Sequence, residues 1–184
     1  MNPQDVDLEK ATPTERVRYL MARLREPVYG CPWDRRQTHE TILPFTLEEA
    51  YEVADAILKG DPRHLREELG DLMFQVVFYA QMAEEADEFT WDQVMLGLEE
   101  KLVRRHPHVF PEGTLESRIA PGSVVSDEQI KCTWEKIKAK EKGELASVLD
   151  EVAVGLAPLQ RSQKLQKSAA KIGFDWPSAK EVVD

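Results

Sequence analysis

Apolar residues recur at three- and four-residue intervals along most of this chain, which is the spacing of one face of an α-helix. No stretch alternates apolar and polar residues as a half-buried strand does. The pattern therefore predicts an all-α protein whose helices are joined by short connectors. Residues 106–125 hold three prolines and two glycines and are expected to be irregular. Helices are expected from residue 13, within 38–59, at 62–86, from 91 to about 106, from 127, at 158–171 and from 178.

Capping signals locate the start of several of these helices. Thr12 to Glu15 and Thr90 to Gln93 have the spacing of a capping box. Gly60, Asp61 and Pro62 read as a stop, a cap and a new helical start. Because this connector is so short, the helices on either side are expected to form an antiparallel hairpin. The expected apolar stripes of the two arms are Leu47, Tyr51, Ala54 and Leu58 on the first and Leu65, Leu69, Leu72, Met73, Val76 and Ala80 on the second.

Acidic pairs mark both arms of this hairpin. Glu49 with Glu52, and Glu68 with Asp71, are three residues apart, so each pair projects from one side of its helix. Packing the arms together would bring four carboxylates close, and they would repel one another unless a cation lay between them. Oxygen ligands of this kind suit Mg²⁺, with Mn²⁺ as a possible substitute. Glu48 is either part of a solvated acidic face or a candidate base that orients a water.

Two other interpretations of the acidic pairs remain open. Glutamates on a helix are commonly a solvated face, as expected for Glu67. A di-iron carboxylate bundle is the second alternative, but it typically carries a Glu-x-x-His pair on each of two helices. Here the third residue after Glu49 and Glu68 is an acid, so the oxygen-only set favours Mg²⁺.

Basic and aromatic side chains supply candidate contacts for a phosphorylated, ring-bearing substrate. Cations at the end of the fourth expected helix can also simply complement the helix dipole. Beside a carboxylate-bound metal, such cations can clamp phosphate groups. His64 is either solvated or a phosphate contact, and the tryptophans either pack in the core or stack on a base. The candidate substrate-binding residues are Lys101, Arg104, Arg105, Trp134, His64 and Trp33.

Composition narrows the class of protein. The chain has 184 residues, enough for one good core, and a formal net charge of −10. Such a balance disfavours a broad nucleic-acid surface, which needs a basic face. The start of the chain lacks the basic-then-apolar order of a signal peptide, and no apolar run is long enough to span a membrane. Only Cys31 and Cys132 could form a disulfide, and reduced thiols in a cytoplasmic protein are the expectation.

Five motifs occur in order along the chain: residues 30–34 (GCPWD) with Gln37 and Thr38, 47–52 (LEEAYE), 68–72 (ELGDL), 104–110 (RRHPHVF) and 173–176 (GFDW). In this combination the chain resembles the MazG family of nucleoside triphosphate pyrophosphohydrolases. The resemblance implies an all-α helical bundle completed by dimerisation, as a homodimer or a dimer of dimers. It also implies Mg²⁺-dependent hydrolysis of an NTP or dNTP to the monophosphate and pyrophosphate.

The motif match carries family roles over to particular residues. It makes Glu49, Glu52, Glu68 and Asp71 metal ligands, and Lys101, Arg105 and Trp134 nucleotide contacts. Family members often have two such domains in tandem, so we expect a pyrophosphohydrolase domain over residues 1–145. Residues 146–184 would then be a helical extension towards a second domain. The alternative function is a weakly active, nucleotide-binding regulatory module.

Overall fold

Helices are the regular elements in the part of the chain that the structure describes, as the sequence predicted. The computed structural model describes residues 6–123, 125–141, 147–150 and 152–176. The helix expected from residue 178 lies outside them. Two compact units are present, residues 1–102 and 103–184, and each is described by itself. A domain boundary after residue 145 stays a prediction. The elements are α1 (Pro13–Leu24), the 3₁₀ turn η2 (Asp34–Arg36), α2 (His39–Lys59), α3 (Pro62–Glu85), α4 (Trp91–Arg105), α5 (Asp127–Glu141) and α6 (Pro158–Ala170).

Local chemistry explains where the first helices begin. The Thr12 hydroxyl accepts from the Glu15 backbone N–H, and the Glu15 carboxylate accepts from the Thr12 N–H at 2.7 Å. The predicted capping box of α1 is therefore confirmed. Thr38 caps α2 in the same way through Thr41. Pro44 lies inside α2 and does not start it, and its ring nitrogen has no hydrogen to donate to the preceding turn.

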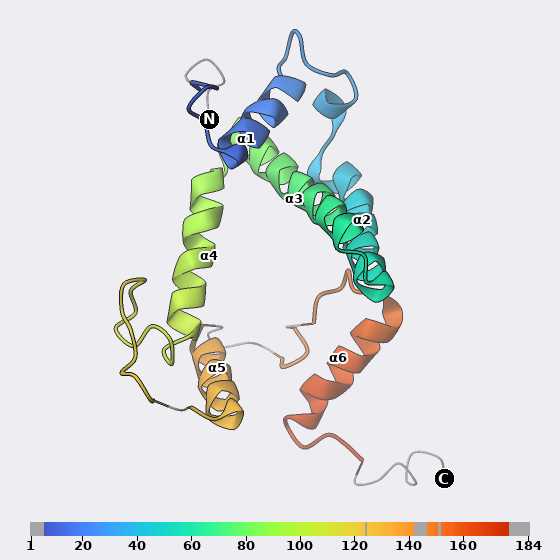
Figure 1. Ribbon diagram of the computed structural model, residues 1–184. Coiled ribbons are helices and arrows are strands. Elements are labelled where there is room, and N and C mark those ends of the chain that lie inside the picture. Colours follow the sequence, from blue (N-terminus) through green and yellow to red (C-terminus); the bar gives the residue numbers. More distant parts are fainter. Residues whose placement is uncertain (1–5, 124, 142–146, 151, 177–184) are drawn as a thin grey trace. The chain divides into compact units, whose positions relative to one another are not determined.

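The predicted antiparallel hairpin of α2 and α3 is also present, and Figure 1 shows the two helices side by side. Gly60 ends α2 in the left-handed region, with φ of 68°, which glycine adopts without steric cost. Asp61 then caps α3, because its carboxylate accepts from the N–H groups of Arg63 and His64. With Pro62 as the first helical residue, two residues suffice to reverse the chain.

One core cluster ties together the first four long helices of the chain. Met21 of α1, Ile42 of α2, Phe78 of α3 and Trp91 of α4 belong to it and are nearly inaccessible to solvent. Phe74, Tyr79 and Met95 pack against it. Burying such side chains contributes about 1.5–3 kcal/mol each. This cluster therefore supplies much of the stability that holds the α2–α3 hairpin in place.

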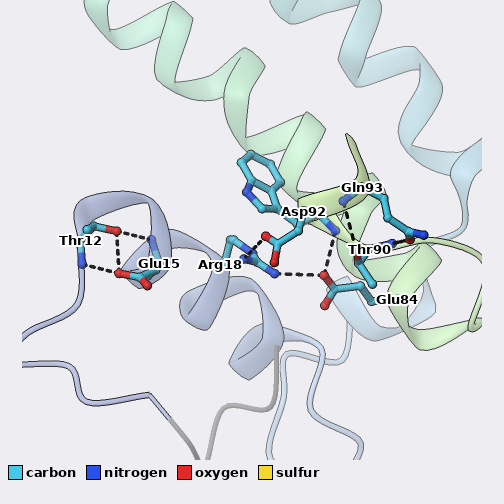
Figure 2. Close-up of polar contacts among 8 residues, drawn as sticks. Thr12, Glu15, Arg18, Glu84, Thr90, Asp92 and Gln93 are labelled. Carbon is cyan, nitrogen blue, oxygen red and sulfur yellow. Dashed lines mark hydrogen bonds and ion pairs between the residues drawn. The ribbon is translucent and has the colours of Figure 1, made fainter. Parts of the chain in front are cut away.

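A polar network at the edge of this core joins α1, α3 and the start of α4. Arg18 donates to Glu84 at 3.0 Å and to Asp92 at 3.4 Å, and its guanidinium lies over the Trp91 ring (Figure 2). Glu84 also accepts from the backbone N–H of Trp91. The predicted capping box between Thr90 and Gln93 is confirmed beside it. The network therefore fixes where α4 starts.

The expected apolar stripes of the hairpin are only partly buried in the single chain. On α2 the buried residues are Ile42 and Ala56, whereas Tyr51 is 60% exposed and Leu58 86% exposed. On α3 Met73 is 51% exposed, although Ala80 is buried as predicted. The sequence predicted apolar stripes on both arms and did not decide whether they pack within one chain or at an interface between chains. The described chain packs other faces of α2 and α3 inward.

The second unit contains α5, α6 and irregular segments. Residues 106–123 form turns without a helix, as their prolines and glycines predicted. Ser126 and Gln129 exchange backbone-to-side-chain hydrogen bonds at the start of α5. Gly173, with φ of 84°, follows the end of α6. Within the described residues, no helix has the length and apolar character needed to cross a membrane.

Candidate functional site

Three carboxylates from the two arms of the hairpin converge on one point. Glu49 of α2 and Glu68 and Asp71 of α3 each place one oxygen within 4.8 Å of the other two. Glu68 is buried, Glu49 is half-buried and Asp71 is exposed. The group is thus anchored in the interface between the helices and open to solvent on one side. A small ion or a phosphate-bearing ligand can approach from that side.

The electrostatics of this group favour a bound cation. Burial raises the pKa of the Glu49 carboxyl, and the negative charges of Asp71, Glu52, Glu68 and Glu48 raise it further. The part of this rise that comes from the neighbouring negative charges means that a positive charge, as a proton or a metal ion, is favoured beside Glu49. All donors are carboxylate oxygens, which is the ligand chemistry of Mg²⁺ and Mn²⁺.

Glu52 was predicted to be the fourth ligand, and the structure does not place it in this group of three. It lies close enough to raise the pKa of Glu49, and its side chain is exposed. Glu48 is exposed in the same way and contributes to the same field. The roles of Glu52 as a ligand and Glu48 as a water-orienting base therefore stay predictions.

His64 contacts the carboxylate group directly. Its Nδ1 lies 3.1 Å from Oε1 of Glu68, one helical turn further along α3. The imidazole can donate to Glu68 in its neutral form and adds an ion pair when protonated. From the sequence, His64 could be either a solvated residue or a phosphate contact. The structure gives it a local partner, and a role toward phosphate stays a prediction.

Arg104 and Arg105 share one carboxylate, and sequence reasoning missed it. Arg104 donates to Oε1 of Glu141 at 2.7 Å, and Arg105 donates to Oε2 from both Nε and Nη2. Hydrogen bonds from Arg105 first, and then from Arg104, lower the pKa of Glu141 to about 2. Because Glu141 follows them by more than 30 residues, no local pattern could have identified it. The pair binds an oxyanion in the way a phosphate clamp does.

The remaining predicted contacts lie in different parts of the chain. Lys101 is half-buried on α4 in the first unit. Trp134 lies on α5 in the second unit, where it is 39% exposed and carries the Lys138 ammonium 4.4 Å from its ring centroid. That Lys101, Arg104, Arg105 and Trp134 meet at one nucleotide with the carboxylates stays a prediction.

Trp33 lies on a loop that α1 and α3 hold in place. Its ring packs edge to face against Phe45 with centroids 5.8 Å apart, and it remains 45% exposed. Arg25 secures the loop, because it donates to the backbone carbonyl of Asp34 at 2.6 Å and to the Glu85 carboxylate at 2.7 Å. Sequence reasoning also missed this anchoring role of Arg25.

The loop before Trp33 depends on one glycine. Gly30 donates to the carbonyl of Glu26, and Cys31 donates to that of Leu24, which folds residues 24–31 back on themselves. A Cβ on Gly30 would lie 2.5 Å from the carbonyl oxygens of both Glu26 and Leu24. The glycine of the GCPWD motif is therefore required for a close backbone approach.

Comparison with known proteins shows which family this chain resembles in sequence. Residues 37–110 match the family model of the MazG nucleotide pyrophosphohydrolase domain. The chain is 46% identical over 172 residues to the nucleoside triphosphate pyrophosphohydrolase of Escherichia coli K12, covering 92% of this chain and 62% of that protein. It is 41% identical over 166 residues to a nucleoside triphosphate pyrophosphohydrolase/pyrophosphatase MazG of Thermotoga maritima, covering 90% of this chain and 60% of that protein.

A solved structure agrees with the sequence comparison. The crystal structure of a mazG-related protein from Thermotoga maritima matches with a TM-score of 0.54 and 28% identity, covering 68% of this chain and 98% of that one. The region that matches the family model, residues 37–110, includes all three converging carboxylates. The chain spans about three fifths of the length of the two curated relatives described above. The chain belongs to the MazG family.

Proposed function

We propose that this protein hydrolyses nucleoside triphosphates, NTP or dNTP, to the monophosphate and pyrophosphate. The observation that carries the proposal is the convergence of Glu49, Glu68 and Asp71 from both arms of one hairpin. Relatives that match most of this chain are named for the same activity. In this proposal the protein works in the cytoplasm on the nucleotide pool, as a house-cleaning or regulatory enzyme. The free thiols of Cys31 and Cys132 are compatible with that compartment.

A divalent cation is the cofactor of the proposed reaction. Mg²⁺ fits the donor set, with Mn²⁺ as a substitute, and Glu49, Glu68 and Asp71 would hold it together with the predicted ligand Glu52. When bound, the cation offsets the charge of the triphosphate oxygens, which this acidic protein would otherwise repel. Burial, and then the neighbouring carboxylates, raise the pKa of Glu49, and a bound cation would relieve the mutual repulsion of these carboxylates.

The chemical step transfers the α-phosphoryl group to water. Water attacks the α-phosphorus, the bond between that phosphorus and the α,β-bridging oxygen breaks, and pyrophosphate leaves with the bonding electrons. The attacking water gives up a proton, and Glu48 is the proposed acceptor because it is next to a ligand and exposed. Lys101, Arg104 and Arg105 are proposed to offset the charge that develops on pyrophosphate.

The nucleoside would be bound by aromatic rings and by the flanking cations. Trp134 and Trp33 are both substantially exposed, and an exposed indole face can stack on a base. His64 is proposed to lie near the phosphates, where Glu68 already orients its ring. Substrate phosphates must compete with Glu141 for the two arginines.

A second copy of the chain is the proposed partner. Tyr51, Leu58 and Met73 are exposed on α2 and α3 of the single chain, and Leu47 and Leu69 are also about half exposed. Such apolar faces commonly mark an interface between proteins. We propose a homodimer or a dimer of dimers that covers them, and sedimentation equilibrium would measure the mass. A monomer at micromolar concentration would contradict this part of the proposal.

The decisive experiment follows the label of α-³²P nucleotides in the presence of Mg²⁺. Labelled monophosphate with unlabelled pyrophosphate is the expected result, and labelled diphosphate with free phosphate would contradict the proposal. Asp71→Asn and Glu52→Gln are expected to abolish turnover while the helical circular dichroism signal is kept. Glu67→Gln serves as the matched control, because Glu67 is exposed on the same helix and outside the converging group.

Binding of nucleotide without any product would favour the alternative function, a regulatory module. A panel of NTPs, dNTPs and damaged nucleotides, scored by pyrophosphate release, would then separate a true regulatory module from an enzyme with a narrow substrate range.

A further inference from the structure

Gln75 is a buried polar residue that lacks a complete set of hydrogen-bond partners. It lies on α3 with only 7% of its surface exposed. Its amide oxygen Oε1 is fully buried and accepts no hydrogen bond in the part of the chain that the structure describes. Leaving a buried carbonyl unpaired costs free energy, and such groups in native proteins usually mark a bound water or ion. A bound water or ion is therefore expected at Oε1 of Gln75.

The position of Gln75 is fixed by contacts on either side of it. Four residues before it, Asp71 joins Glu49 of α2 in the carboxylate group. Four residues after it, the hydroxyl of Tyr79 lies 2.8 Å from that of Thr46 on α2. Residues four apart share one side of a helix. Gln75 is therefore on the side of α3 that faces α2, opposite the turn between Thr46 and Glu49.

This placement puts the amide next to the carboxylate group. With a rise of 1.5 Å per residue, Gln75 lies about 6 Å along the helix axis from Asp71. A glutamine side chain and one water molecule together span such a separation. Glu68, two turns before Gln75 on the same side, is buried as well. The interface between α2 and α3 thus carries a polar row that leads from the carboxylates to Gln75.

We propose that Gln75 is a positioning residue of the divalent-cation site, and that its Oε1 accepts a hydrogen bond from a water molecule in the hydration shell of the cation. This inference rests on the proposed function, since it uses the cation held by Glu49, Glu68 and Asp71. Mg²⁺ keeps several of its waters when proteins bind it. Partners that hold the outer shell of a metal commonly change its affinity by about 10- to 100-fold.

The choice of side chain supports this role. An apolar residue of the same size would fill the position without leaving an unpaired carbonyl, so the amide has a cost in the metal-free protein. A further carboxylate would add to the repulsion that already raises the pKa of Glu49. A neutral acceptor can hold a water and adds no charge to the group.

Gln75→Met tests the inference, because methionine has a similar length and no amide. The test compares the variant with the parent protein in two measurements. Calorimetry gives the Kd of Mn²⁺ in the absence of nucleotide, and urea unfolding in EDTA gives the midpoint without metal. The expected result is a Kd about 10- to 100-fold higher, together with an unchanged or higher urea midpoint in EDTA. Gln81→Met is the matched control on the same helix, since Gln81 already donates to Glu85. It should bind Mn²⁺ as the parent protein does.

Gln75→Glu keeps an acceptor oxygen at this position and should bind Mn²⁺ at least as tightly as the parent. This variant keeps the test decisive if Gln75→Met does not fold, because Mn²⁺ binding weakened tenfold in Gln75→Glu would overturn the inference. An unchanged Mn²⁺ affinity in folded Gln75→Met would also overturn it. If Gln75→Met binds Mn²⁺ normally and the parent protein hydrolyses nucleotide, the inference alone is overturned. If Gln75→Met binds Mn²⁺ more weakly than the parent and the parent has no hydrolytic activity, the inference is supported and the proposed function is contradicted.

Discussion

The guanidinium of Arg18 lies 3.0 Å from the carboxylate of Glu84, and both side chains are nearly buried at the junction of α1 and α3 (Figure 2). Arg18→Met removes the guanidinium and leaves the Glu84 carboxylate with fewer partners, although it still accepts from the backbone N–H of Trp91. We therefore expect Arg18→Met to lower the free energy of unfolding by about 1–3 kcal/mol. Equilibrium urea unfolding followed by circular dichroism measures this loss.

Replacing both partners of this ion pair should cost less than the sum of the two single losses. A double-mutant cycle with Glu84→Gln reports the coupling between them. Arg16→Met is the matched control, because Arg16 is exposed on the same helix. If the two single losses simply add, Arg18 and Glu84 do not interact in solution.

Neutralising Glu49 should stabilise the protein when metal is absent. Burial and the neighbouring carboxylates raise the pKa of Glu49 in the folded state. The folded protein then binds this proton more tightly than the unfolded chain does. Stability therefore falls as pH rises from the ordinary pKa of 4.5 through the raised value. Glu49→Gln lacks this fall, so its urea midpoint in EDTA at pH 7 should exceed that of the parent.

Added Mg²⁺ should reverse this order. It binds the folded parent protein and stabilises it by mass action, whereas Glu49→Gln loses a ligand and gains little. Urea midpoints at several Mg²⁺ concentrations measure both effects. A parent protein that Mg²⁺ does not stabilise would contradict the assignment of Glu49.

Releasing Arg104 and Arg105 from Glu141 should strengthen substrate binding. Glu141→Gln removes the negative charge with which phosphates compete, so we expect the KM for nucleotide to fall and kcat to stay the same or rise. Glu135→Gln, an exposed glutamate on the same helix, is the control. An increase in KM for Glu141→Gln would show instead that Glu141 holds the arginines in their binding positions.

The ion pairs of Glu141 with Arg104 and Arg105 should be lost at low pH. The pKa of Glu141 falls from 4.5 to about 2 in the folded protein, so its contribution to stability is complete above pH 4.5 and is lost as pH falls towards 2. The carboxyl chemical shift of Glu141 in a pH titration checks the direction. A midpoint near 4.5 would show that the pairs with Arg104 and Arg105 do not persist in solution.

Gly30→Ala should disturb the loop that carries Trp33. The new methyl group would meet two backbone oxygens at 2.5 Å, so the loop must shift, at a cost of about 1–3 kcal/mol. Gly97→Ala on α4 is the control, because a Cβ there meets nothing within 4 Å and alanine favours a helix by about 1 kcal/mol. Urea unfolding of both variants separates the two effects. Equal stabilities would contradict the close approach at Gly30.

Much of the fold followed from local chemistry in the sequence. The capping boxes at Thr12 and Thr90 and the reversal at Gly60 act within a few residues, and the helical spacing of Glu68 and Asp71 set their shared face. It was harder to predict which face of α2 packs inward. Tyr51 and Leu58 have the spacing of an apolar stripe whether they pack inside one chain or against another molecule. The partners of Arg25 and Arg104 could not be predicted for a different reason. Arg25 pairs with Glu85 and Arg104 with Glu141, and dozens of residues separate the members of each pair in the sequence.

The short turn at Gly60 has a consequence for how the molecule forms. Glu49 and Asp71 are about 20 positions apart in the chain, so closing the hairpin brings them together at a small entropic cost. Contacts between near neighbours in sequence tend to form early in folding. The carboxylates would then be crowded together while most of the chain is still unfolded. A divalent ion in the refolding buffer should therefore accelerate folding as well as stabilise its product, and the magnesium level of the surroundings would govern how quickly each new chain matures.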